Sequence, residues 1–197
     1  MVKVKIMKKE MSSKESLELI TQMISRAKEE AAGDGSFQLL LWGWVVATCN
    51  FGHYILEKVG YDTPHIVWLL IIPATGVSIW DSIRKRNRAR VKTHLDDMLV
   101  GIWISVFIGI MITLGFMASL GFQHNPVILI LAGIGVISTG VLVRVNVVRN
   151  GGILLMAAAV VAFLLPVIDQ YLVAGIAMIF GYLVPGYYLK TTYRERV

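Results

Sequence analysis

The sequence predicts an all-α membrane protein, a polytopic bundle of six transmembrane helices preceded by a cytoplasmic amphipathic helix. Composition is the first reason: 56% of the 197 residues are hydrophobic and 16% are charged, whereas soluble domains have about 25% charged residues. The second reason is the presence of six apolar segments of about 18 residues or more, a length that crosses a bilayer as a helix. The third is the distribution of Lys and Arg, of which 18 of 19 fall on one side of these segments.

The first 35 residues are predicted to form a cytoplasmic segment with one amphipathic helix over residues 13–32. Ser12 and Glu15 have the spacing of a capping box, which starts a helix. Apolar residues then recur at steps of three and four, which places them on one face: Leu17, Ile20, Ile24, Ala27 and Ala31. We expect Gly33 and Gly35 to end this helix. It then either lies on the membrane surface or against the ends of the bundle, or docks a partner or a second copy.

Six spans follow and define a transmembrane domain over residues 36–189. Each is long enough to cross about 30 Å of hydrocarbon, and a helix satisfies its own backbone hydrogen bonds where water is absent. The predicted spans are Ser36–Leu56, Ile66–Ile83, Met98–Leu120, Pro126–Val143, Gly151–Ile168 and Tyr171–Leu189. We expect Pro73 and Pro185 to kink the second and sixth spans. Residues 190–197 form a short tail.

The positive charges assign an orientation to these spans. Seven Lys and Arg precede the first span, six lie between the second and third, two follow the fourth and three are in the tail, whereas the other side carries Lys58 alone. The positive-inside rule therefore puts both termini in the cytoplasm, and an even number of spans agrees with this. The connections on the other side are short, so they offer little surface for a large external ligand.

The connection between the second and third spans is strongly basic. We predict that it contacts anionic lipid headgroups through Arg84, Lys85, Arg86, Arg88, Arg90 and Lys92. Nucleic acid is not predicted as a partner, because no aromatic residues for base stacking alternate with these charges.

Asp81 and Arg144 close the second and fourth spans at one depth, so we predict an inner-side ion pair between them. The alternative is that Asp81 pairs with Arg84 or Lys85 in its own helix.

A polar stripe on the first span is the most informative candidate site. Asn50, His53 and Glu57 share one helix face, and Tyr54 lies beside them. Polar groups within a span normally face the bundle interior or a water-filled cavity. We therefore predict an intramembrane polar site made of these four residues, either a dry contact between helices or a wet cavity. Four further residues are expected at a similar depth: Asp62, His65, His124 and Asp169.

No metal site, cofactor or catalytic centre is predicted. Metal ligands would have to come from four separate segments without a recurrent spacing. Gly76–Ile79 has the outline of the GxSx nucleophile motif of rhomboid-type proteases, but the fourth and sixth predicted spans hold no catalytic histidine. We therefore expect a protein that is not an enzyme.

Small residues predict where helices pack closely. In the fifth and sixth spans they recur at a spacing of four residues, which lets two backbones approach: Ala158, Ala162, Ala177 and Gly181. This face packs either within the chain or across a two-fold axis of a homodimer, the commonest oligomer. We therefore expect a homo-oligomer.

Several segments of the first half resemble one group of proteins. Ser16–Ile20, Leu41–Trp44, Val67–Leu70 with Pro73, and Val91–Thr93 are similar to an uncharacterised family of small six-span bacterial inner-membrane proteins. Members of this family are often encoded beside a small winged-helix transcriptional regulator. The resemblance implies a location in the bacterial inner membrane and a regulatory context, and it implies no catalytic residue.

These observations predict a non-enzymatic integral inner-membrane protein that acts as a regulatory, sensory or accessory component. Its cytoplasmic helix and basic connection would contact a cytoplasmic protein partner. The alternative is a small oligomeric transporter or channel with a polar path near Asn50 and His53.

Overall fold

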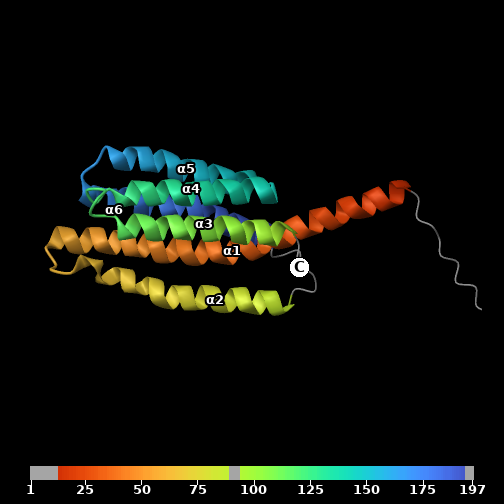
Figure 1. Cartoon of the computed structure of the whole chain (residues 1–197), viewed down its shortest axis with the longest axis horizontal. Helices are drawn as coiled ribbons and strands as arrows, with labels where there is room; N and C mark the ends of the chain where they lie inside the picture. The colour runs from red at the N-terminus through yellow and green to blue at the C-terminus, as the bar shows by residue number, and fades with distance from the viewer. Residues whose placement is uncertain (1–12, 89–93, 194–197) are drawn as a thin grey trace, which may run out of the picture.

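The computed structural model describes residues 13–88 and 94–193 (Figure 1). Within these ranges, six helical stretches are long and apolar enough to cross a membrane, which confirms the predicted all-α bundle. Residues 1–12 and 194–197 lie outside the described ranges, as do Arg90 and Lys92 of the basic connection. The elements in chain order are α1 (Ser13–Val59), η1 (Pro64–Leu70), α2 (Ile71–Arg88), α3 (His94–Gly115), α4 (His124–Val143), α5 (Asn146–Phe163), α6 (Val167–Met178), η2 (Ile179–Leu183) and α7 (Val184–Tyr193).

The first helix is longer than predicted. α1 continues for 47 residues through Gly33 and Gly35, so the predicted helix end at residue 32 is wrong. A glycine inside a helix costs about 1 kcal/mol relative to alanine, which is too little to stop a long helix in which every added residue gains a hydrogen bond. The N-terminal part of α1 extends beyond the bundle (Figure 1). It therefore does not pack against the ends of the other helices.

Other span boundaries also differ from the prediction, including the end of the fifth span at Phe163 and the start of the sixth at Val167. α5 begins at Asn146, so the connection from α4 consists of Arg144 and Val145, and Arg149 lies within α5. Arg144 adopts the left-handed conformation with φ 59°, which reverses the chain directly after the helix. α3 ends at Gly115 rather than at Leu120, and a series of turns leads from there to α4.

The two ends of the bundle differ in charge. At the basic end, α2, α4 and α7 end, α1 projects outward, and Arg84 and Lys85 lie on α2. At the far end are the connections from α1 to η1, from α3 to α4 and from α5 to α6, together with Glu57 and Asp169.

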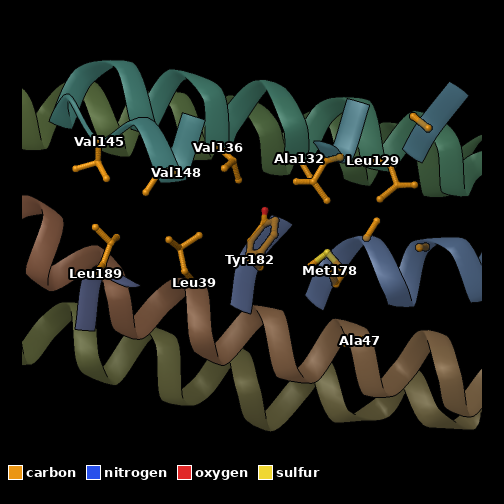
Figure 2. Close-up of a cluster of buried hydrophobic side chains, with 14 of the residues drawn as sticks. Leu39, Ala47, Leu129, Ala132, Val136, Val145, Val148, Met178, Tyr182 and Leu189 are labelled. Carbon is orange, nitrogen blue, oxygen red and sulfur yellow. The ribbon is translucent and has the colours of Figure 1, made fainter. Parts of the chain in front are cut away.

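The core lies between the α4–α5 hairpin and a layer made of α1 and the sixth span, which comprises α6, η2 and α7. Figure 2 shows Val136 and Val148 of the hairpin facing Leu39 of α1 and Tyr182 of the sixth span. The core continues toward the far end through other buried apolar side chains, which include Ala47, Leu129, Ala132 and Met178. Burial of these side chains is the main source of packing energy between the spans, because dispersion contacts replace the hydrophobic effect within a bilayer.

The second span is peripheral. In an apolar stretch of 18 residues of this span 6% are buried, compared with 50% in such a stretch of the sixth span. α2 contacts chiefly α1 and η1, and Figure 1 shows it on the side of α1 that is opposite to α4 and α5. The second span is therefore held by one helix, whereas α1 is held by several.

Both prolines predicted to kink a span coincide with a change of helix type. Pro73 is the third residue of α2, directly after the 3₁₀ helix η1. Pro185 is the second residue of α7 and follows η2, a π-helical turn over Ile179–Leu183. A proline has no N–H for the preceding turn of helix, so the hydrogen-bond ladder is interrupted at that point.

Two consecutive glycines of α5 set its distance from both neighbours. A methyl group on Gly152 would lie 2.7 Å from the backbone nitrogen of Ile137 and 2.8 Å from the carbonyl oxygen of Gly133, both in α4. A methyl group on Gly151 would lie 2.7 Å from the carbonyl oxygen of Gly181 in η2. These separations are shorter than van der Waals contact, so α5 can approach α4 and η2 this closely only through residues without a side chain.

The four small residues of the predicted packing face lie inside the chain. Ala162 and Ala177 are buried, and Ala158 is partly buried against the core. Gly181 faces Leu155 of α5, whose side chain a methyl group there would meet at 2.6 Å. Gly181 is therefore not free for the predicted homodimer contact, because α5 of the same chain already occupies that face.

We expect Gly152→Ala to destabilise the protein by about 1–3 kcal/mol, the usual cost of overpacking, because the added methyl group meets backbone atoms that cannot rotate away. Gly76→Ala is the matched control, since a methyl group at Gly76 meets nothing within 4 Å. Thermal unfolding in detergent would measure both variants. Equal melting temperatures for the two would contradict the close contact between α4 and α5.

Candidate functional site

The predicted polar stripe of α1 points in two directions. Asn50 and His53 are buried, with 2% and 9% of their surface exposed, whereas Glu57 is exposed. Tyr54 is half-buried and lies below the Lys58 ammonium, which is 5.3 Å from its ring centre. Asn50 and His53 are therefore the residues of the stripe that other spans surround, and Glu57 lies between His53 and the surface of the far end.

His53 contacts three side chains from three elements. Its ring stacks on Tyr171 of α6, with 3.9 Å between ring centres and 17° between planes. The indole Nε1 of Trp68 in η1 donates a hydrogen bond to His53 Nδ1 at 3.2 Å. Glu57 Oε2, one turn further along α1, lies 3.9 Å from His53 Nε2. We call His53, Glu57, Trp68, His124, Gln170 and Tyr171 the far-end cluster.

The hydrogen bond from Trp68 fixes the tautomer of His53. An indole N–H can only donate, so His53 Nδ1 must accept and cannot carry a proton while this bond is present. The proton of the neutral ring is therefore on Nε2, which is the nitrogen that faces the Glu57 carboxylate.

Tyr171 and Gln170 connect the start of α6 to the start of α4. The Tyr171 hydroxyl lies 3.3 Å from His124 Nε2. Gln170, which is fully buried, donates from Nε2 to Gln123 Oε1 at 2.6 Å and to the carbonyl oxygen of Leu165 at 3.1 Å. These bonds hold the first turns of two helices together at the far end.

A second set of contacts holds η1 to α1 beside the His53 ring. Cys49 is buried, and its thiol donates to the carbonyl oxygen of Val67 at 3.2 Å. The Val67 side chain packs over Gly52, where a methyl group would lie 3.1 Å away. Because no residue of η1 is itself buried, these contacts and the Trp68–His53 hydrogen bond account for much of its attachment.

Some buried polar atoms around the far-end cluster have no hydrogen-bond partner. Asn50 Nδ2 donates to the carbonyl oxygen of Val46 at 2.8 Å, a bond within α1. Among the described residues, four buried side-chain atoms have no hydrogen-bond partner: Asn50 Oδ1, His124 Nδ1, Asn125 Nδ2 and Gln170 Oε1. An unpaired buried polar atom costs about 1–3 kcal/mol. In the described residues these atoms all lie at the far end.

Of the four residues expected at a similar depth, one joins the cluster. His124 is buried beside Tyr171, whereas Asp62 and His65 are exposed. Asp169 forms an ion pair with Lys58 across 3.4 Å, which ties α6 to α1 at the surface of the far end. In the described residues, no three His, Cys, Asp or Glu side chains are placed to hold a metal ion.

The predicted ion pair between Asp81 and Arg144 is wrong. α2 and α4 lie on opposite sides of α1 (Figure 1), so the two side chains cannot meet. Asp81 Oδ2 instead pairs with Lys85 Nζ at 2.8 Å, which confirms the alternative within its own helix. Asp81 also accepts from Gln38 Nε2 of α1 at 3.4 Å, so this carboxylate takes part in holding α2 to α1.

The predicted lipid-contacting residues lie at the basic end as far as the structure describes them. Arg84 is exposed and its guanidinium lies 5.3 Å from the Trp80 ring centre, and Lys85 Nζ lies 5.6 Å from the centre of the Phe37 ring. Arg86 and Arg88 belong to the last turns of α2. A cation that lies on an aromatic ring near the end of a span is typical of the membrane interface, so contact with anionic headgroups stays a prediction that this geometry allows.

We expect Tyr171→Ala to lower the free energy of unfolding by about 3–5 kcal/mol, the usual cost of removing a buried aromatic ring. Tyr171→Phe keeps the stack on His53 and loses the hydroxyl contact to His124, so it should cost about 1 kcal/mol. Tyr188→Ala, at an exposed position, serves as control in the same unfolding assay. If Tyr171→Ala cost no more than the control, the far-end cluster would not stabilise the bundle.

Comparison with protein-family models, with curated proteins and with solved structures finds no match for this chain. The family resemblance of its first half therefore stays a prediction.

Proposed function

We propose that this chain is a regulatory or sensory component of the bacterial inner membrane that acts through the projecting part of α1 and the basic connection. The continuity of α1 is the observation that carries this proposal. The helix that contributes His53 to the far-end cluster is the same one that extends beyond the basic end. At 1.5 Å per residue its 47 residues span about 70 Å, more than twice the hydrocarbon thickness of about 30 Å. A movement of α1 at the far end would therefore be transmitted along the helix to the other side of the membrane.

The projecting part of α1 carries exposed apolar side chains. Leu17, which belongs to the predicted apolar stripe, is 67% exposed; Leu19 and Met23, on the other side of the helix, are 46% and 63% exposed. Apolar side chains of a helix outside the bilayer are typical anchors for a groove on a protein partner. A cytoplasmic protein partner is the proposed recipient of the signal.

Both termini are proposed to lie in the cytoplasm. The basic end carries nearly all of the positive charge, and the far end carries Lys58 paired with Asp169. Cytoplasmic segments next to spans are enriched in Lys and Arg, and the anionic lipids of that leaflet attract them.

The transporter alternative has less support. On the basic side of Asn50, the buried residues of α1 are apolar as far as Leu39, with Ala47 and Gly43 between them. Figure 2 shows apolar side chains from both layers filling this region. In the described part of the chain, the polar residues at the far end therefore do not continue as a polar path toward the basic end.

Membrane orientation can be tested by thiol labelling in a Cys49→Ala background. We expect Asp62→Cys to react with a membrane-impermeant maleimide in intact cells, and Thr21→Cys to react only after the membrane is opened, because the two positions lie on opposite sides. Labelling of Thr21→Cys in intact cells would reverse the proposed orientation.

The docking surface can be tested with two variants that each place one negative charge on a different face of α1. We expect Leu17→Glu to remove the partner that co-purifies with the full-length protein from native membranes, since it places a carboxylate in an apolar contact. Gln22→Glu adds the same charge on another face and should keep the partner. Both variants should insert normally. If full-length protein recovers no partner, or if the two variants behave alike, the docking proposal fails.

A further inference from the structure

We infer that His53 is a proton-sensing switch that fastens η1 to α1 only while its Nδ1 is unprotonated. This inference rests on the proposed sensory function and names the signal as the proton concentration at the far side of the membrane. It follows from the chemistry of three contacts: the Trp68 indole at Nδ1, the Glu57 carboxylate near Nε2 and the stack on Tyr171.

Protonation reverses the role of the nitrogen that holds Trp68. In the neutral ring Nδ1 accepts the indole hydrogen bond. An imidazolium carries hydrogens on both nitrogens, so Nδ1–H and the indole N–H would be two donors facing each other. The hydrogen bond is then lost, and the contact becomes unfavourable. No rotation of the indole can restore it, because tryptophan offers no acceptor.

The surroundings give a proton a route to His53. The Glu57 side chain is 38% exposed and lies 3.9 Å from Nε2, so it connects the ring to the surface. Burial of the ring disfavours its charged form, and the Glu57 carboxylate partly offsets this effect. The other titratable groups around the ring are Tyr171 on α6, His124 on α4 beyond the Tyr171 hydroxyl, and the exposed His65 on η1. A positive charge on His124 or His65 would oppose a charge on His53.

η1 is held lightly enough for one bond to matter. It has no buried residue, and its other polar contact to α1 is the weak hydrogen bond from the Cys49 thiol to the carbonyl oxygen of Val67. Loss of the Trp68 bond would therefore let η1 separate from α1 at Val67 and expose Cys49.

Movement of η1 would reach the basic end through α2. α2 follows η1 without a connecting loop at Ile71. Its main polar attachment to α1 is Gln38, which accepts from Ser78 Oγ at 2.7 Å and donates to Asp81 Oδ2 at 3.4 Å. These bonds lie near the basic end, so α2 can tilt about them once η1 has separated from α1. The tilt would move Arg84 and Lys85, which α2 carries at the membrane surface.

Cys49 is a reporter for this release because it is the one cysteine of the chain and is fully buried. The test uses full-length protein in lipid nanodiscs and 4,4′-dithiodipyridine, a membrane-permeable disulfide that reacts with thiols in acid. Reaction rates are measured at several values from about pH 8 to about pH 5, a range that spans the ordinary titration of histidine. Each rate is divided by that of the SDS-unfolded protein at the same pH.

We expect the normalised rate for the native sequence to rise about fivefold to tenfold on acidification, the change in open population that loss of one hydrogen bond produces. His53→Gln keeps an acceptor for Trp68 and cannot be protonated, so its rate should stay low throughout. Trp68→Phe should react fast at every pH. His65→Gln, the control on η1, should respond as the native sequence does.

Three results would overturn the inference: a native rate independent of pH, a His53→Gln variant that keeps the acid response, or a Trp68→Phe variant as protected at about pH 8 as the native protein. The last measurement does not depend on whether His53→Gln folds. Failure here would leave the docking role of α1 intact, since that role is tested separately by Leu17→Glu and Gln22→Glu.

Discussion

The close contact of helix backbones at Gly151 and Gly152 is the constraint on which the rest of the bundle depends. Two adjacent residues of a helix point to different sides, so one glycine admits the backbone of α4 and the other admits that of η2. α4 and the sixth span are thereby fixed on either side of α5. α1 packs beside the sixth span, and its buried face from Leu39 to His53 is determined by the positions of these helices.

The molecule consists of a tightly packed part and a loosely held part, and His53 lies where they meet. α4, α5 and the sixth span share the apolar core, whereas η1 and α2 attach to α1 through a few polar contacts. His53 joins the two parts, because its ring stacks on Tyr171 of the core and accepts a hydrogen bond from Trp68 of η1. A switch requires a weakly attached element beside a rigid one. Binding of one proton supplies little free energy, so it can displace only an element with few stabilising contacts.

Much of the candidate site was beyond prediction from the sequence. The residues Asn50, His53 and Glu57 stand out because polar groups are rare in spans, and His124 was expected at their depth. Trp68 and Tyr171 gave no such signal, because aromatic residues near the ends of spans are explained by the membrane interface alone. Only the packing of η1 and α6 against α1 shows that both rings contact His53. Gln170 looked like a residue of a turn, yet it is fully buried inside the first turn of α6.

The sequence by itself determined the number of spans and their helical form, because apolar length and backbone hydrogen bonding in hydrocarbon depend on local composition. It also determined which ends carry positive charge. The tertiary structure decided which spans are neighbours. It thereby decided the ion-pair partner of Asp81, which is Lys85 because α2 and α4 lie on opposite sides of α1. It decided as well that α1 continues through Gly33 and Gly35. Apolar helices of similar length carry little information about their partners, so their arrangement depends on side-chain shape and close contacts that appear only when the helices are packed together.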